Sequence, residues 1–353
     1  MKRPYTVLLI VPTGIGAAIG GYAGDALPVA RAISQVADCL ITHPNVLNGA
    51  QLYWNLPNAL YVEGYGLDQV AAGRWGLRPV HQNRVGLVLD QGIEPDLRLR
   101  QLQAADATRA TLGLNLTEYI VTDTPLNVSL KTAASGATWG TIEHPDSLLR
   151  AVDQLIHQAG AQAIAVVARF PDDPGSTALQ QYRQGQGVDP LAGAEAVISH
   201  LVVRTFQIPC AHAPALSPLP LDRSVSPRSA AEELGYTFLP CVLVGLSQAP
   251  QFVTARSLPQ VGDVWADQID AVILPATACG GSAVLSLSHS STRIITVAEN
   301  TTTLHVTPER LNISALQVQS YVEALGVLVC DRAGISAAAL HPNVTAVQGL
   351  VDW

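Results

Sequence analysis

Short apolar runs alternate with longer helix-like segments along nearly the whole chain, and this alternation constrains the fold more than any other feature. Several runs are apolar without interruption, such as residues 164–168 and 271–274. A strand that reads this way is covered on both faces, as in a parallel sheet between two layers of helices. The pattern therefore predicts an α/β fold with mainly parallel sheets and helices on both faces, arranged as two Rossmann-like lobes around a cleft.

The predicted elements cover most of the chain. The expected strands are residues 6–11, 39–43, 59–63, 84–90, 118–123, 163–169, 238–246, 271–275 and 294–299. The expected helices are residues 23–37, 94–112, 146–159, 190–203, 227–234, 281–290 and 314–325. No low-complexity linker divides the chain. We expect an N-terminal lobe of residues 1–145 and a C-terminal lobe of residues 146–353, with a Pro-rich loop at 205–227 packed between them.

Composition excludes several classes of protein. Of the 353 residues, 48% are hydrophobic and 14% are charged, against roughly 25% charged in typical domains. Such a chain folds rather than staying disordered. The scarcity of charges predicts a large core and a buried interface in a homo-oligomer. The net charge of −8 argues against a nucleic-acid partner bound through a basic face.

The cysteines and the N-terminal segment bear on location. The five cysteines are widely spaced and form no CxxC, so reduced thiols in the cytoplasm fit better than a disulfide framework. Lys2 and Arg3 precede an apolar run, but Pro12 ends it after about five residues, fewer than the roughly 7–15 of a signal peptide. No run reaches the roughly 20 apolar residues of a membrane span, so no membrane insertion is expected.

The first strand is followed by a glycine-rich segment. The expected ligand-binding residues in it are Thr13, Gly14, Gly16, Gly20 and Gly21. Glycines let backbone N–H groups approach an anion, and the next helix offers its positive end. The segment is neither a dinucleotide fingerprint, because Ile19 replaces the last glycine, nor a P-loop, because no Gly-Lys-Ser/Thr follows. Anion binding, a dinucleotide cofactor and tight structural packing remain alternatives.

Polar residues follow several predicted strands. Further ligand-binding candidates of this kind are His43, Asn45, Glu63, Asp123, Arg169 and Asp172. In open α/β sheets ligands bind beyond the carboxyl ends of the strands, where these side chains would collect. Each residue alone is equally typical of an ordinary turn. Arg169 would pair with a carboxylate or a phosphate.

A second distinctive segment, residues 275–282, places a thiol between a buried strand and a helix start. A helix N-terminus lowers the pKa of a thiol, which makes Cys279 the candidate nucleophile. Its expected ligand-binding neighbours are Gly280, Gly281 and Ser282.

Three further residues complete the predicted catalytic set: Cys210, His212 and Glu299. A Cys–His pair would support nucleophilic catalysis or a two-thiol proton transfer like that of amino-acid racemases. The opposing interpretation is that the cysteines are small, buried apolar side chains. The spacing of His212, Glu299, Asp172 and Asp173 is not that of a metal site, so no metal is expected.

Several motifs together resemble a known family. They are Pro-Thr-Gly-Ile-Gly at 12–16, Thr-His-Pro-Asn-Val-Leu-Asn at 42–48, Ala-Arg-Phe-Pro-Asp-Asp at 168–173, Gly-Val-Asp-Pro-Leu-Ala-Gly-Ala-Glu-Ala at 187–196, Pro-Cys-Ala-His-Ala-Pro at 209–214 and Ala-Cys-Gly-Gly at 278–281. The family occurs in cyanobacteria and plastids and is catalogued as domain of unknown function 3326 (DUF3326). The resemblance covers nearly the whole chain and implies a protein of photosynthetic cells. It supplies no reaction and no assigned residues.

The leading hypothesis is an enzyme that acts on a small anionic metabolite in a cleft between the lobes. Cys279 with His212 or Glu299 would carry acid–base or nucleophilic chemistry, which leaves isomerase, racemase-like, lyase and hydrolase reactions open. The alternative is a non-catalytic metabolite-binding or assembly protein. A nicotinamide enzyme is a third hypothesis, and the sequence itself names no cofactor.

Overall fold

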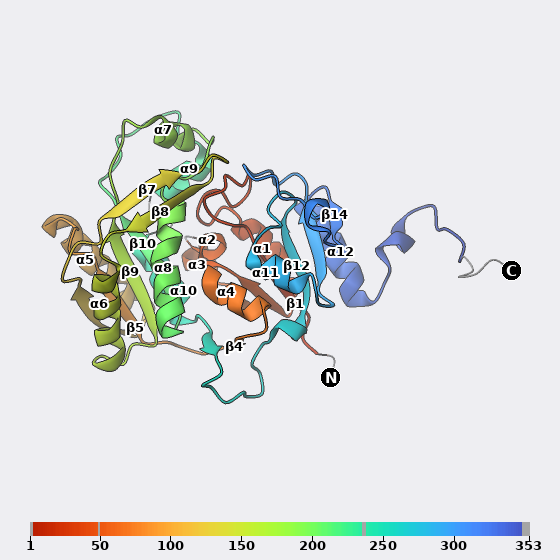
Figure 1. Cartoon of the computed structure of the whole chain (residues 1–353), viewed down its shortest axis with the longest axis horizontal. Coiled ribbons are helices and arrows are strands. Elements are labelled where there is room, and N and C mark those ends of the chain that lie inside the picture. The colour runs from red at the N-terminus through yellow and green to blue at the C-terminus, as the bar shows by residue number, and fades with distance from the viewer. Residues whose placement is uncertain (1–2, 49, 235–237, 348–353) are drawn as a thin grey trace.

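The computed structural model describes residues 3–48, 50–234 and 238–347 (Figure 1). Its larger sheet has six strands, all parallel to their neighbours. In spatial order they are β14 (Leu316–Val318), β13 (Arg293–Val297), β12 (Ile269–Pro275), β1 (Thr6–Leu9), β2 (Cys39–Thr42) and β3 (Ala59–Tyr61). Counted along the chain within this sheet, the order is 3-2-1-4-5-6, which is the order of a Rossmann fold.

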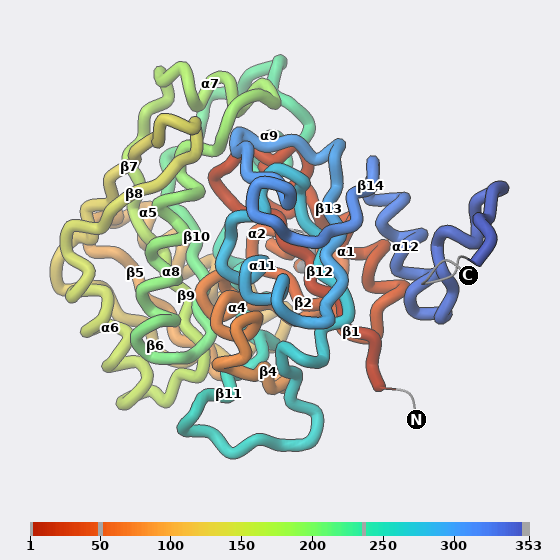
Figure 2. The backbone as a smooth tube through the Cα atoms, turned by 45° about the vertical axis from the view of Figure 1, so that its right-hand side comes forward, coloured from red at the N-terminus to blue at the C-terminus, as the bar shows by residue number. Residues whose placement is uncertain are grey.

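A second unit is inserted between the third and fourth strands of that sheet. It contains a four-stranded parallel sheet, in the order β10 (Cys210–Ala215), β9 (Ala163–Arg169), β5 (Val85–Leu89) and β6 (Leu116–Val121). Two antiparallel pairs accompany it: β4 (Gly76–Arg78) with β11 (Gln251–Val253), and β7 (Val128–Thr132) with β8 (Thr138–Ile142). Figure 2 shows this yellow-to-green unit beside the red and blue strands of the first sheet.

Helices cover both faces of each sheet, as predicted. The described helices are α1 (Leu27–Ser34), α2 (Pro44–Leu47), α3 (Ala50–Tyr53), α4 (Gly64–Ala71), α5 (Pro95–Leu112), α6 (Pro145–His157), α7 (Thr177–Arg183), α8 (Ala192–Phe206), α9 (Pro227–Glu233), α10 (Leu239–Ser247), α11 (Ser282–Leu287) and α12 (Tyr321–Ala333). Helices α1 and α12 contact the six-stranded sheet, and α10 contacts the four-stranded one (Figure 1). Helices α5 and α6 both have proline in the first turn. A backbone N–H at that position would have no partner within the helix, so proline loses no hydrogen bond there.

The α/β class with parallel sheets is confirmed, but the sheets do not coincide with lobes of residues 1–145 and 146–353. Each sheet takes strands from both sides of residue 145. In the six-stranded sheet, β12, β13 and β14 return to pair beside β1, and in the second sheet β9 and β10 join β5 and β6. The two sheets also share their cores. Leu9 of β1 and Leu89 of β5 belong to one apolar cluster, and Leu8 and Val88 belong to the other.

Two predicted elements are wrong. Residues 238–246, predicted as a strand, form helix α10, and both faces of that helix are buried. A continuous apolar run fits a buried strand and a buried helix equally well, so periodicity could not decide. The Pro-rich segment 205–227 is not all loop either, because residues 210–215 form strand β10 at the edge of the second sheet. Proline is tolerated in edge strands.

The predicted helix 314–325 begins later than expected. The structure has β14 first, and α12 starts at Tyr321, after Ser320. The hydroxyl of Ser320 accepts a hydrogen bond from the backbone N–H of Glu323, which satisfies one of the free donors of the first turn.

Asp90 fixes the carboxyl end of the second sheet. This side chain follows β5 and is 1% exposed. Its carboxylate accepts hydrogen bonds from the backbone N–H groups of Gly92 (2.9 Å), Leu126 (2.9 Å) and Arg169 (3.0 Å). One side chain therefore joins three segments that are distant in sequence.

We predict that Asp90→Asn lowers the free energy of unfolding by about 2–4 kcal/mol, because an amide NH₂ would face N–H donors and a buried donor would lose its acceptor. Urea unfolding followed by circular dichroism measures this. Asp96→Asn, at an exposed position in the first turn of α5, is the matched control and should cost less than about 1 kcal/mol. An Asp90→Asn protein as stable as the parent would contradict this role.

Candidate functional site

The two distinctive segments of the sequence lie at the same edge of the six-stranded sheet. The glycine-rich segment follows β1 and residues 276–281 follow β12, its direct neighbour. The loop after β13 bridges them: the hydroxyl of Thr302 lies 2.7 Å from that of Thr277, and the backbone N–H of Thr303 donates to the carbonyl of Ile15 at 2.9 Å. The strand order reverses between β1 and β12, which is where open α/β sheets bind ligands.

Glycine is required in this loop for two separate reasons. Gly14, Gly16 and Gly20 have positive φ angles of 70°, 60° and 92°, a region that other residues rarely adopt. At Gly21 the reason is space, since an added Cβ would lie 2.3 Å from the carbonyl oxygen of Ala17.

Side chains from neighbouring loops hold the glycine-rich loop in place. The Asn45 amide donates to the carbonyl of Gly20 at 2.7 Å, and the carbonyl of Asn45 accepts from Gly24 N–H at 2.7 Å. Asn300 accepts from Ile19 N–H and donates to its carbonyl, both at 2.9 Å. Asn45 was expected to bind ligand, and its observed partners are the loop itself.

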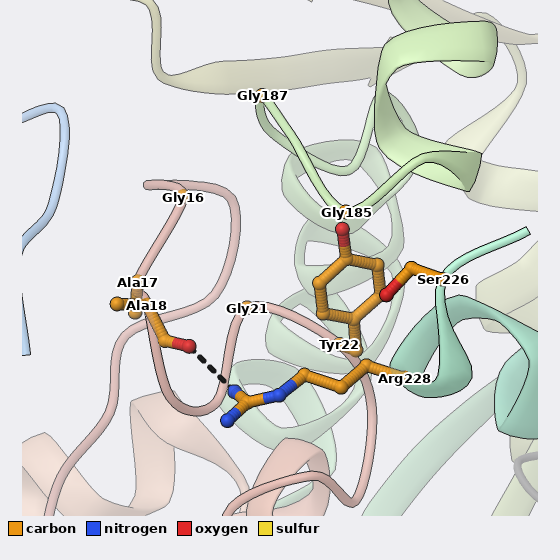
Figure 3. Close-up of a pocket in the computed structure, with 9 residues that line it drawn as sticks. All are labelled: Gly16, Ala17, Ala18, Gly21, Tyr22, Gly185, Gly187, Ser226 and Arg228. Atoms are coloured by element: carbon orange, nitrogen blue, oxygen red, sulfur yellow. Dashed lines mark hydrogen bonds between the residues drawn. The ribbon is translucent and has the colours of Figure 1, made fainter.

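A pocket of about 300 Å³ opens above this loop (Figure 3). The six-stranded unit contributes the glycine-rich loop, and the inserted unit contributes the segment before α8 and the start of α9. The lining residues are Gly16, Ala17, Ala18, Gly21, Tyr22, Gly185, Gly187, Ser226 and Arg228. Its volume lies at the small end of the roughly 300–1,000 Å³ typical of ligand pockets.

Arg228 is the cationic group of the pocket. Its guanidinium donates to the carbonyl of Ala18 at 2.5 Å and to the carboxylate of Asp25 at 2.9 Å, and 45% of its side chain is exposed. Burial raises the pKa of Asp25 to about 6, while Arg228 and the backbone N–H groups of Gly20 and Tyr22 act against this rise. The other carboxylate oxygen of Asp25, Oδ1, is buried and has no hydrogen-bond partner.

Further buried acids lie behind the pocket wall. Tyr22 stacks on Tyr182 with ring centroids 4.4 Å apart, and the hydroxyl of Tyr182 lies 2.5 Å from the Glu232 carboxylate. Burial, reinforced by nearby Asp189, raises the pKa of Glu232 well above its usual range. Burial likewise raises the pKa values of Asp189 and Glu195. Raised pKa values in a concave site are a common mark of functional groups.

His212 belongs to this network and is not paired with a thiol in any described contact. Its Nδ1 lies 3.1 Å from the hydroxyl of Ser199, and its Nε2 lies 3.7 Å from the Glu195 carboxylate. Burial lowers the pKa of His212 to about 4, so the ring is neutral. A substrate cannot reach Ser199, which is 2% exposed, so this trio is an internal network and not a nucleophilic triad.

The fit to a dinucleotide is poor, although the strand order is that of a Rossmann fold. The N–H groups that would hold a pyrophosphate already have partners in this chain: those of Ala18 and Ile19 bond Thr301 and Asn300, and that of Ala23 faces Glu232. The residue after β2 is His43 and not an acid, and its buried ring accepts the N–H of Val11 at 3.0 Å. No three His, Cys, Asp or Glu side chains are grouped as metal ligands in the described residues.

Most of the other predicted ligand-binding residues have structural partners away from the pocket. Arg169 contacts Glu94 at 2.9 Å and Asp172 at 2.5 Å, so two carboxylates of the chain occupy its guanidinium. Asp123 pairs with Arg150 at 2.7 Å on the surface. Glu63 caps α4 and contacts His200.

Glu299 and the loop after β12 also make local contacts. The Glu299 carboxylate accepts the N–H of Tyr321 at 3.2 Å, at the start of α12. Gly281 is the residue preceding α11, and Ser282 is its first residue. A Cβ added to Gly280 would lie 3.1 Å from the side chain of Val306, and none of these residues lines the pocket. Thr13 and Gly14 lie in the turn after β1 outside the pocket lining, and the Gly14 carbonyl accepts from Thr138 N–H at 2.9 Å.

The argument for a reactive thiol fails on burial. Cys279 is 0% exposed, and burial raises its pKa to about 11 instead of lowering it. The helix that follows is six residues long and begins three residues later. Cys210 is 1% exposed, and burial raises its pKa well above the usual range.

The residues that define the pocket were mostly missed by sequence reasoning. Ser226 lies at the end of the Pro-rich segment 205–227 and Arg228 lies just after it, while Tyr182 and Glu232 lie on short helices of the inserted unit. The one local sign of this part of the pocket in the sequence is the glycine pair Gly185 and Gly187, whose φ angles are 85° and 80°. Such a glycine pair marks a turn but not what the turn faces.

The chain belongs to the family described as "Protein of unknown function (DUF3326)", whose model matches residues 6–341. A protein named "Uncharacterized lipoprotein" from Synechococcus sp. is 62% identical over 344 residues, which cover 97% of this chain and 95% of that protein. These findings confirm the resemblance drawn from the motifs. No solved structure matches the chain.

We predict that Glu232→Gln flattens the decline of stability with rising pH. The folded state holds the Glu232 proton more tightly than the unfolded chain, whose glutamates titrate near about 4.3. This stabilisation is therefore complete below about pH 4 and is lost as the pH rises through the raised pKa. Between pH 5 and 9 the parent should lose at least about 1 kcal/mol more than the variant in urea titrations. Exposed Glu118→Gln is the control and should follow the parent.

A thiol titration tests the burial of Cys279. We expect the Cys279 thiol to react with an aromatic disulfide reagent only after denaturation, because it is buried and its pKa is about 11. Peptide mapping after labelling at pH 7.5 identifies the site. Rapid labelling of Cys279 in the folded protein would restore it as a candidate nucleophile.

Proposed function

We propose that this member of the DUF3326 family binds a small anionic metabolite in the pocket between the glycine-rich loop and the start of α9. The observation that carries the proposal is the half-exposed guanidinium of Arg228 on the wall of a pocket of about 300 Å³. Arginine is suited to bidentate contact with a carboxylate or phosphate. The carboxyl end of β1, where the strand order reverses, is the place where this sheet architecture binds ligands.

Binding in this pocket would be coupled to a proton. The Asp25 carboxylate, whose pKa is about 6, already pairs with Arg228 at 2.9 Å. An incoming anion competes for the same guanidinium, so Asp25 loses part of the interaction that favours its charged form and takes up a proton. The site thus exchanges one internal anion for an external one.

Acid–base catalysis is a second candidate, favoured by Glu232. Burial keeps this carboxyl protonated near neutral pH, and the Tyr182 hydroxyl lies 2.5 Å from it, behind Tyr22 of the pocket wall. A protonated acid next to an anion pocket is what proton transfer to a bound metabolite requires. A ligand that binds equally to Glu232→Gln but is converted only by the parent would support catalysis. No conversion by either protein favours a binding role.

A thermal-shift screen tests the binding proposal. The panel contains phosphorylated sugars, nucleotides including NAD(P), dicarboxylates and amino acids, and a ligand at a hundred times its Kd stabilises by about 2.7 kcal/mol. We expect a hit that Arg228→Gln abolishes and exposed Arg100→Gln, on α5, retains. A hit that survives Arg228→Gln would place the ligand elsewhere, and the absence of any hit would contradict the proposal.

The same ligand should bind more tightly at lower pH. Proton uptake by Asp25 predicts that the Kd rises by up to about tenfold per pH unit above pH 6. Asp25→Asn should remove this dependence, which titration calorimetry between pH 5.5 and 8 measures. A Kd that is independent of pH in the parent would rule out the coupling while leaving the pocket itself intact.

For the location, we keep the cytoplasm as the proposal for this chain, although its Synechococcus relative is named a lipoprotein. The support for this proposal is that Cys39, Cys210, Cys279 and Cys330 form no disulfide, as is usual for thiols in a reducing compartment. No helix in the described parts is long and apolar enough to cross a membrane. Recovery of the tagged chain in the membrane fraction of cells would contradict this proposal.

A further inference from the structure

Helix α12 carries an apolar face that the described residues leave uncovered. Val322 and Val329 are 78% and 51% exposed, and Gly326 and Ala333 are exposed beside them. These four residues are spaced four, three and four apart, so they form one line along the helix. A Cβ added to Gly326 would meet nothing within 4 Å. The opposite face of α12, which includes Ala324 and Leu328, packs into the apolar core of the chain.

An apolar arm continues from this helix. The helix ends at Ala333 and is followed by Gly334, whose φ angle is 71°. Residues 335–347 then extend away from the body of the molecule (Figure 1). Ile335, Leu340, Val344 and Val347 are 49%, 70%, 69% and 103% exposed. Four large apolar side chains are thus presented to solvent on a segment that adjoins the uncovered face of α12.

The exposed face of α12 is complementary to itself in size. If a second copy packs its α12 antiparallel against this one, Val322 lies opposite Ala333 of the second copy, and Gly326 lies opposite its Val329. A large side chain then meets a small one at each level along the whole line. Such pairing lets two helices approach closely without leaving a void.

Charge supports the same orientation. Glu323 stands in the first turn of α12 and Arg332 in the last, and both are exposed at least in part. Antiparallel packing places the acidic end of one helix beside the basic end of the other, and it also opposes the two helix dipoles. Arg332 additionally contacts Asp38 at 2.6 Å, which holds the guanidinium at this edge.

The arm adds contact area to an interface for which one helix alone is too small. A stable interface takes roughly 20–30 residues from each side, more than the 13 residues of α12. In a two-fold arrangement, the arm of one copy leaves the end of its α12 beside the start of α12 in the other copy. Leu316 of the neighbouring edge strand β14 is 40% exposed there. The exposed residues of the helix, together with the arm and β14, therefore approach that size more closely than the helix alone.

We propose that α12 and the arm of residues 335–347 form a two-fold interface with a second copy of this chain. The two α12 helices pack antiparallel through Val322, Gly326, Val329 and Ala333, and each arm lies across the partner's β14 and the start of its α12. The interface lies on the far side of the six-stranded sheet from the inserted unit, so it does not depend on the ligand proposed above.

Light scattering coupled to gel filtration tests the proposal. We expect the full chain to be a dimer at micromolar concentration. Val329→Glu should raise the dimer dissociation constant at least about tenfold, because each new carboxylate would be buried beside Gly326 of the other copy without a charge partner. Leu99→Glu, at an exposed position of α5, is the matched control and should remain dimeric. A second variant that lacks residues 335–353 should also dissociate more readily. A monomeric full chain, or a dimer unaffected by Val329→Glu, would overturn the proposal.

Disulfide trapping tests the orientation. A chain with Val322→Cys, produced together with a chain with Ala333→Cys, should form a mixed disulfide on oxidation. Neither variant alone should do so, since equivalent residues would lie about 16 Å apart along the helices at 1.5 Å per residue, beyond the roughly 7 Å that a disulfide spans. Cross-linking of either variant alone, or none in the mixture, would contradict the antiparallel arrangement. The parent, whose native cysteines include buried Cys330, is the control.

Discussion

The parallel pairing of β1 with β12 is the constraint on which the rest of the structure depends. It joins a strand at residues 6–9 to one at residues 269–275 and places both at the centre of the six-stranded sheet. The intervening chain must therefore leave the sheet and return to it, which is why the second sheet is an insertion and not a C-terminal lobe. The pairing also places the loops after β1 and β12 side by side at the point where strand order reverses.

Backbone N–H groups of the glycine-rich loop face the chain's own carboxylates. These are Asp25 and Glu232, and Arg228 binds Asp25 from the other side. Burial of these acids leaves part of the site protonated near neutral pH. An external anion would therefore replace an internal one at Arg228, and a proton would move with it.

The strands predicted most accurately are those whose apolar runs are short and uninterrupted, as at residues 163–169 and 271–275. Their sequences exclude a surface helix, and their length suits a strand. Residues 238–246 show the limit of this reasoning, because the same kind of run is a helix buried on both faces. Residues 210–215 show the converse, since a strand at a sheet edge tolerates the proline that suggested a loop.

For the site, local pattern identified the glycine-rich loop but not its partners. Gly16 and Gly21 line the pocket as expected, whereas Arg228 and Tyr22 line it because distant segments fold against the loop. Arg169 was a reasonable candidate by its place after β9, yet Glu94 and Asp172 occupy its guanidinium. Cys279 was expected to be reactive beside a helix start, but its pKa is controlled by burial, which only the packed core determines.

By itself, the sequence determined the α/β class, the parallel character of the sheets and the membership of the DUF3326 family, because these follow from local periodicity and from motifs that are contiguous in the chain. Only the tertiary structure decided that β12 returns beside β1, that Glu232 comes close to Asp189 and Asp25, and that Arg228 faces the glycine-rich loop. The physical reason is that strand pairing, desolvation and charge pairing act through space between residues far apart in the chain, such as Thr6 and Ile269, and no local pattern encodes which distant group will be the neighbour.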